Sequence, residues 1–242
     1  MAANKLLHHA VPAHYMGVWQ RTLLQSSAGV DITLTDTTSL VLWMQTQHYH
    51  IDIRIPANLQ NLSKVNQLTD YSIYELHLLA HQQGFAGITQ VDADICNWHR
   101  EMDFQPATQQ RDIGKMVFET PDFLIETGLD ADYLEHWQLL PNSQINCFFR
   151  AVKAFNRHGL ESTAYLMRAG QYIAYARPRG VLLPQADSLI DAIELHQPDI
   201  ETLCDWLDME ISFGELLNDN SWQIKYSTVP FKQGLIVNLQ LA

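Results

Sequence analysis

The feature that most constrains the fold of this 242-residue chain is a strand-turn-strand pattern that occurs twice. The first copy, LVLWMQTQHYHIDIRIP from Leu40 to Pro56, contains two apolar or alternating runs separated by a break at Gln47-His48. Such a pattern predicts a β-hairpin. The second copy, TAYLMRAGQYIAYARPR from Thr163 to Arg179, repeats the strand, turn, strand and arginine. The chain is therefore predicted to contain two versions of one β-unit.

Further landmarks support the repeat because their order is preserved at nearly constant spacing. The matched pairs have offsets between 123 and 130 residues, and they are Arg21 with Arg150, Gly29 with Gly159, Arg54 with Arg177, Trp98 with Trp222, and Pro106 with Pro230. The length alone is compatible with one large domain or two small ones. The repeat favours two, divided at Pro141-Asn142-Ser143 into residues 15–141 and 142–242.

Each unit is predicted to be mainly β-structure. In the first, eight short strands are separated by clusters of turn-forming residues, and the capping-box spacing of Ser72 and Glu75 predicts a helix over about residues 73–83 after the third strand. Eight such strands favour an antiparallel up-and-down barrel. The second unit shows about six strands and helical patterns at about residues 188–208. It is predicted to form an incomplete barrel or curved sheet against the first, which gives an all-β fold with a few helices.

The start of the first predicted strand carries a family resemblance. Gly17-Val18-Trp19 resembles the G-x-W signature of the calycin superfamily, the lipocalins and fatty-acid-binding proteins. In that superfamily the tryptophan seals the floor of the barrel and an arginine packs across it, so the resemblance implies a lipocalin-like barrel over residues 15–141. The two-unit arrangement resembles uncharacterised tandem lipocalin-like proteins. The resemblance covers the first strand and the strand count, and it implies a scaffold more than a function.

Strand alternation predicts which side chains share the barrel interior. If Trp19 faces inward, Arg21 does too, while Tyr133, Glu135 and Trp137 share one face of a later strand. The strand ICNWHREMDFQP is expected to turn Cys96, Trp98, Arg100, Met102 and Phe104 inward, and His99, Glu101 and Asp103 toward solvent. The predicted ligand-binding residues are Trp19, Arg21, Trp98, Arg100, Tyr133 and Glu135.

These residues predict a small-molecule site, since such sites combine aromatic walls with a few convergent polar groups. The expected ligand is small and partly apolar, with an anionic head group as one option because a guanidinium group matches two oxygens. In an alternative interpretation, Arg21 and Glu135 pair internally and plug the barrel. Two other function classes remain open: an isomerase or hydrolase that uses Arg100 with Glu135 or Tyr133, and an interaction scaffold with a filled barrel. No catalytic residue is assigned.

The charge balance limits the partners. The formal net charge of −12 comes from 27 acidic and 15 basic residues, without a cluster of lysine or arginine. Because nucleic-acid binding depends largely on neutralising phosphates, nucleic acid is disfavoured, and an anionic membrane surface is disfavoured for the same reason. No apolar run approaches the roughly 18 residues that predict a membrane span. The oligomeric state is not predicted.

Cofactor and metal motifs are not found. The sequence has no G-x-S-x-G elbow, P-loop, dinucleotide fingerprint or paired CxxC. His77 and His81 have a metal-compatible spacing, but Leu78 stands where a metalloprotease needs glutamate, so we expect solvated histidines and no metal site. Three scattered cysteines and the absence of an apolar signal-peptide core in residues 1–15 predict a cytoplasmic protein.

Overall fold

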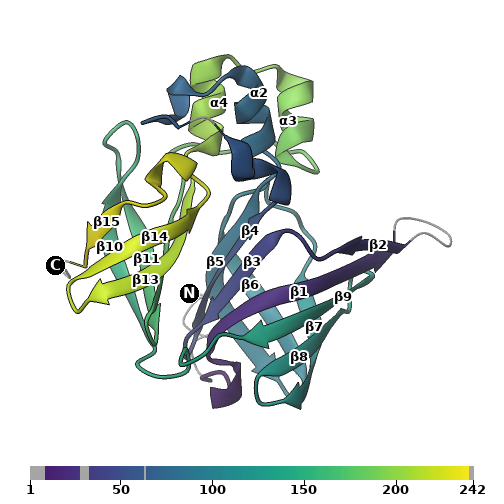
Figure 1. Ribbon diagram of the computed structural model, residues 1–242. Helices are drawn as coiled ribbons and strands as arrows, with labels where there is room; N and C mark the ends of the chain where they lie inside the picture. Colours follow the sequence, from purple (N-terminus) through teal and green to yellow (C-terminus); the bar gives the residue numbers. More distant parts are fainter. Residues whose placement is uncertain (1–8, 28–32, 63, 240–242) are drawn as a thin grey trace.

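The computed structural model describes residues 9–27, 33–62 and 64–239, and it contains two antiparallel sheets with α-helices at one end (Figure 1). The predicted landmark Gly29 and the first eight residues lie outside the described residues. Among the described residues, no helix has both the length and the apolar character needed to cross a membrane.

The first sheet forms a closed barrel. Its strands are β1 (Gly17–Ser27), β2 (Thr33–Asp36), β3 (Leu40–Gln45), β4 (Tyr49–Ile55), β5 (Gln83–Asp92), β6 (Ile95–Asp103), β7 (Asp112–Thr120), β8 (Phe123–Gly128) and β9 (Tyr133–Leu139). The order is β2-β1-β3-β4-β5-β6-β7-β8-β9, and β9 also pairs with β1. This pairing closes an eight-stranded antiparallel barrel, as predicted. The ninth strand, β2, is short and pairs only with the last residues of β1, Leu24 to Ser27.

The second sheet is curled and open. Its strands are β10 (Phe148–Phe155), β11 (Glu161–Ala169), β12 (Tyr172–Arg177), β13 (Glu210–Asn218), β14 (Ser221–Ser227) and β15 (Ile236–Asn238), each paired with the next. The predicted smaller β-unit with six strands is confirmed. The predicted domain division at residues 141 and 142 falls in the segment between the two sheets.

Strand pairing shows the same order of elements in both sheets. In the first, Trp43 of β3 lies opposite Asp52 of β4. In the second, Leu166 of β11 lies opposite Tyr175 of β12, and each of these residues follows its counterpart by 123 positions. The sequence repeat therefore corresponds to a repeat of strand register, in which the second sheet has no counterparts of β8 and β9.

A β-bulge recurs at the same place in both sheets. Gly87 of β5 lies opposite Arg100 of β6 beside one bulge, and Gly214 of β13 lies opposite Ile224 of β14 beside the other. A Cβ atom on either glycine would lie 1.9 Å from a backbone carbonyl oxygen of the neighbouring strand. Both bulges therefore require glycine, because no side chain fits at this distance.

One predicted landmark pair is wrong by two residues. Arg150 of β10 lies opposite Leu166, which is the place that Trp19 holds opposite Trp43 in the barrel. The register counterpart of Trp19 is therefore Arg150, and Arg150 does not correspond to Arg21. Matching two arginines along the sequence missed this shift because only the pairing with the next strand fixes it.

The α-helices are α2 (Ile73–Leu79), α3 (Leu189–His196) and α4 (Ile200–Leu207), and 3-10 turns occur at η1 (Ala13–Tyr15), η2 (Ala57–Asn61), η3 (Leu68–Asp70) and η4 (Pro230–Lys232). The predicted capping box of α2 is confirmed: the backbone N–H of Glu75 donates to the Ser72 hydroxyl, and that of Ser72 to the Glu75 carboxylate. The helix ends before residue 83 because Gln83 already pairs with Arg54 in the barrel.

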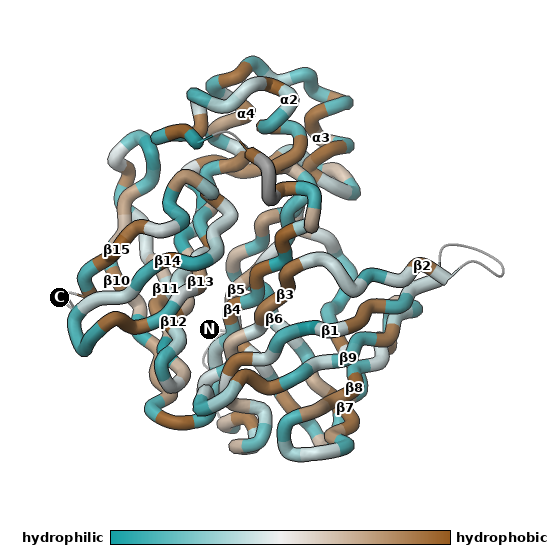
Figure 2. The backbone as a smooth tube through the Cα atoms, viewed as in Figure 1, coloured by the Kyte–Doolittle hydropathy of each residue, from teal (hydrophilic) through white to brown (hydrophobic). Residues whose placement is uncertain are grey.

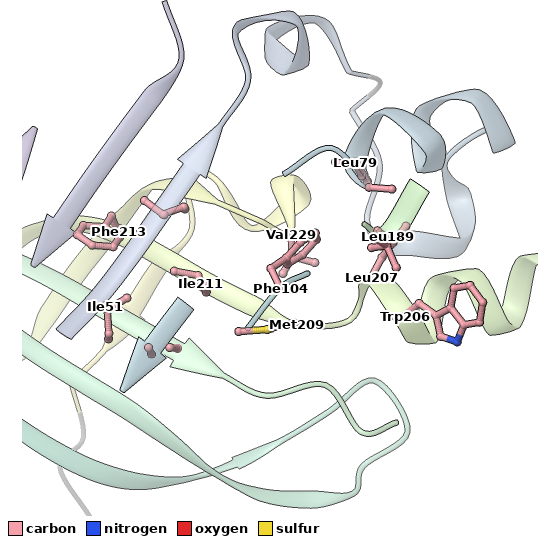
Figure 3. Close-up of a cluster of buried hydrophobic side chains, with 14 of the residues drawn as sticks. Ile51, Leu79, Phe104, Leu189, Trp206, Leu207, Met209, Ile211, Phe213 and Val229 are labelled. Carbon is pink, nitrogen blue, oxygen red and sulfur yellow. The ribbon is translucent and has the colours of Figure 1, made fainter. Parts of the chain in front are cut away.

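The largest hydrophobic core lies between the two sheets and under the helices (Figure 3). Ile51 and Ile53 on the outer face of β4 pack in the same cluster as Ile211 and Phe213 of β13. Brown, hydrophobic stretches accordingly run along β3 and β4 in Figure 2. The isoleucine face of β4 is thus outside the barrel, so its other face, which carries Arg54, points into the barrel.

Replacement of Ile51 by alanine tests the shared core. Ile51 is fully buried, so Ile51→Ala should lower the free energy of unfolding by about 2–5 kcal/mol through lost burial and an unfilled cavity. The matched change Ile145→Ala, at a side chain that is 59% exposed, should change it by less than about 0.5 kcal/mol. Urea unfolding followed by tryptophan fluorescence measures both. A shift of similar size in the two variants would contradict a core at this place.

Candidate functional site in the barrel

Aromatic side chains fill one end of the barrel. Trp19 is fully buried, and its indole N–H donates to the backbone carbonyl of Tyr15 at 2.9 Å. Its ring stacks on Trp43, with 6.4 Å between ring centroids, and Trp43 packs edge-on against Trp98 and Trp137. Trp19 is therefore part of the barrel floor, which is the place that the calycin resemblance implies.

A layer of paired charges lies above this floor. Glu135 Oε1 accepts from Arg21 Nη1 at 2.7 Å and from Arg54 Nη1 at 3.5 Å. Arg21 also donates to Asp36 at 2.7 Å, and Arg54 to Asp52 at 2.9 Å. Arg21 and Glu135 thus form the internal pair on which the plug interpretation depended, whereas the plug itself is not shown. The second oxygen, Glu135 Oε2, is buried and has no hydrogen-bond partner among the described residues.

The other end of the barrel is hollow. A cavity of 770 Å³ lies there, within the range of roughly 300–1,000 Å³ that is typical of small-molecule sites. Four of the six predicted ligand-binding residues line it, namely Trp98, Arg100, Tyr133 and Glu135. The other two, Trp19 and Arg21, lie on the same inner face but do not line it, because the floor and the charge layer occupy their positions.

The bulge between β5 and β6 decides which β6 side chains reach the cavity. Gly87 lies opposite Arg100 and the preceding residue lies opposite Met102, so Glu101 is the extra residue and the inward alternation reverses after it. Asp103 consequently lines the cavity, whereas Met102 and Phe104 pack in the core between the sheets. The predicted inward position of Met102 and Phe104 and the predicted solvent position of Asp103 are therefore wrong, and His99 of the predicted solvent face lines the cavity as well.

Arg100 is held on three sides. Its Nη1 donates to Asp103 at 2.8 Å, and its Nε and Nη2 donate to Asp112 at 3.0 and 2.7 Å. The guanidinium carbon lies 3.8 Å from the centroid of the Phe85 ring, a cation–π contact. At the mouth, Arg111 pairs with Asp130 at 2.9 Å. All the arginines that line the cavity are thus already bound to carboxylates.

Glu126 lies deeper, below the cavity, and its buried surroundings shift the titration of its carboxyl group. It is 4% exposed, and it accepts from the Tyr133 hydroxyl at 2.6 Å and from the Trp137 indole N–H at 3.1 Å. Burial, together with the nearby Glu135 carboxylate, raises the pKa of Glu126 well above its usual range. The structure therefore favours the protonated, neutral form of this side chain.

Sequence reasoning missed several groups of this site. Arg54, Asp52, Asp112 and Glu126 lie inside the barrel or line the cavity, but none stands in a recognisable motif. A polar face on β4 opposite three isoleucines was the available signal for Arg54 and Asp52. In the described part of the chain, no group of three or more His, Cys, Asp or Glu side chains is arranged to hold a metal ion.

No protein-family model, curated protein or solved structure matches this chain. Its function has to be inferred from the barrel and the cavity.

Removal of Arg21 tests the charge layer. Arg21→Met leaves the buried Glu135 and Asp36 without this partner, so the free energy of unfolding should fall by about 3–5 kcal/mol. Arg111→Met is the control, and it should leave stability nearly unchanged because its pair with Asp130 is largely exposed to solvent. Chemical denaturation of both variants and the wild type measures these free energies of unfolding. Equal stability of Arg21→Met and the wild type would show that the pair does not stabilise the barrel.

The raised pKa of Glu126 gives a pH dependence of stability. In the folded state Glu126 holds its proton more tightly than in the unfolded state, so wild-type stability should fall as pH rises from the usual carboxyl range through the raised pKa. Glu126→Gln cannot titrate there. The unfolding free energy of Glu126→Gln minus that of the wild type should therefore increase as pH rises, by at most about 1.4 kcal/mol per pH unit. Urea unfolding between about pH 4 and about pH 8 measures it. A difference that does not change with pH would contradict the assignment.

Proposed function

We propose that this protein binds a small organic molecule in the cavity at the hollow end of its barrel. The observation that carries the proposal is Glu135: this side chain is 2% exposed, lines the cavity, and leaves Oε2 without a partner among the described side chains and backbone groups. An unpaired buried acceptor costs about 1–3 kcal/mol, and more when it is charged. Oε2 is itself buried, so a turn of the Glu135 carboxylate toward the cavity is needed before a ligand that donates a hydrogen bond removes this cost.

The walls of the cavity suit a ligand of mixed character. Trp98 and Tyr133 supply aromatic surface, and Arg100 and Asp103 supply polar groups whose positions are fixed by hydrogen bonds. A site that is already ordered binds without a large loss of side-chain freedom. An eight-stranded barrel that is sealed at one end and holds one small ligand is also the arrangement of lipocalins, so we extend the family resemblance to a lipocalin-like binding role.

The same contacts favour binding over the two alternatives. An interaction scaffold with a filled barrel is not expected to contain a cavity of 770 Å³ above its floor. Arg100 and Tyr133, the groups that an isomerase or hydrolase would use, are held by Asp112 and Glu126. Catalysis therefore stays a prediction from the sequence, and ligand binding is the function that the site supports best.

Two variants of β1 test where a ligand binds. Ser26 lies opposite Tyr133 and lines the cavity, so Ser26→Trp should place a bulky indole in it and obstruct a ligand there. Gln25 is on the opposite face of the same strand and is exposed, so Gln25→Trp is the matched control. Mass spectrometry of the purified proteins, first native and then denatured, should release a small molecule from the wild type and Gln25→Trp only.

Other outcomes would count against this function. Equal occupancy of the two variants would place the ligand outside the cavity. A wild-type protein that is empty, and whose thermal unfolding no member of a broad metabolite collection shifts, would contradict the proposed function.

A further inference from the structure

We infer that the ligand of this cavity is a small organic cation, such as an amine with an aromatic or aliphatic body. The inference rests on the proposed function and deepens it. It reverses the expectation of an anionic head group, which came from counting arginines in the sequence without their partners.

The first argument is the balance of fixed charge. Inside the barrel, three arginines, Arg21, Arg54 and Arg100, are held by five carboxylates, which are Asp36, Asp52, Asp103, Asp112 and Glu135. Among these groups negative charge exceeds positive charge by two. Among the charged residues that line the cavity it exceeds positive charge by one, since Arg54, Arg100 and Arg111 stand against Asp103, Asp112, Glu135 and Asp187. Burial is also the largest effect on Asp52 and Asp103, and it raises the pKa of each. A bound cation relieves this excess because it places opposite charge in a partly desolvated site.

The second argument is the geometry of Glu135. Its Oε1 atom already accepts from two guanidinium groups, those of Arg21 and Arg54, whereas its buried Oε2 atom has no protein donor in the described ranges. The partner that Oε2 lacks is a hydrogen-bond donor, which a bound group supplies once the carboxylate turns Oε2 toward the cavity that Glu135 lines. An ammonium group supplies both the donor and the positive charge, and hydrogen bonds between charged groups are the stronger kind.

The third argument is that an anionic ligand would bind unfavourably in this cavity. A carboxylate or phosphate ligand would have to compete with Asp112 for two of the donors of Arg100. It would also enter a space bordered by the carboxylates of Asp103 and Glu135. Like charges at short distance are strongly unfavourable in a desolvated site.

The aromatic wall is compatible with a cation. The ring of Phe85 already has the guanidinium groups of Arg54 and Arg100 at 5.4 and 3.8 Å from its centroid. Trp98 lines the cavity and presents the kind of ring that attracts cations most strongly. The net charge of −12 on the whole chain adds a long-range attraction for cations.

Probes that differ only in charge test the inference. Two sets are suitable: 2-phenylethylamine, 2-phenylethanol and phenylacetate, and tryptamine, tryptophol and indole-3-acetate. Isothermal titration calorimetry of the full chain at neutral pH should give an amine affinity at least about tenfold above that of the alcohol and the acid of the same set. Ser26→Trp should abolish this binding, and Gln25→Trp should retain it.

The outcomes separate this inference from the proposed function. If an alcohol or an acid binds as tightly as its amine, or more tightly, the cation inference is overturned while small-molecule binding stands. If none of the six probes binds at up to about 10 mM, the cation inference is contradicted, while the proposed function is decided by the mass spectrometry and the metabolite collection described above. If the amines bind equally to the wild type and Ser26→Trp, they bind elsewhere and the inference is wrong.

A charge variant tests the cause of the preference without removing the buried Glu135. Asp112→Asn deletes a carboxylate that holds Arg100, so the ratio of amine to acid affinity should fall by about tenfold. Glu161→Gln makes the same change in charge at the exposed pair with Lys153 in the second sheet, away from the cavity, and it should leave the ratio nearly unchanged. Thermal unfolding confirms that both variants are folded. Equal ratios in Asp112→Asn and the wild type would overturn the electrostatic argument.

Discussion

The two unlike faces of β4 set the arrangement of the whole molecule. Ile51 and Ile53 are fully buried on one face, while Asp52 and Arg54 lie on the other. A strand of this kind cannot place its isoleucines in the barrel without turning its charges into another apolar layer. The charged face lies inside the barrel, and the isoleucine face needs a cover. The second sheet and the helices supply that cover, so the curled sheet and the hollow barrel follow from the same alternation.

The charged interior is stable because its ions are partnered, and it is also incompletely satisfied. Arg21, Arg54 and Arg100 each contact carboxylates at hydrogen-bond distance. Carboxylates outnumber these arginines, and one oxygen of Glu135 has no donor in the part of the chain that the structure describes. A charge layer built only to plug the barrel is expected to be satisfied internally, since unpaired buried groups are costly. The groups that stay unsatisfied are carboxylates. A bound molecule that carries positive charge and hydrogen-bond donors would satisfy them.

Local patterns predicted the local features of this fold. The capping box of α2, the eight strands of the barrel and the six strands of the second sheet depend on neighbours in sequence, and they are found as expected, with the short strand β2 in addition. The contents of the cavity depend on contacts between distant residues. Arg100 was expected to be available for a ligand, but Asp112 and Asp103 hold it. The bulge beside Gly87 reverses the inward face of β6, and a bulge is fixed by cross-strand pairing, which no single strand reveals.

The repeat itself explains why the site belongs to the barrel alone. In the second sheet the counterparts of Trp43, Asp52 and Arg100 are Leu166, Tyr175 and Ile224. The strands β8 and β9, which bring Glu126, Tyr133 and Glu135 to the barrel, have no counterparts there. Arg54 and Trp98 have identical counterparts, Arg177 and Trp222, and Arg177 is buried in a 2.7 Å pair with Asp208. Without closing strands, the second sheet buries an apolar face of its own around Trp222, beside the ion pairs of Glu210 with Arg177 and Lys232. The same β-unit therefore encloses a charged cavity in one copy and, in the other, covers the outer face of the first.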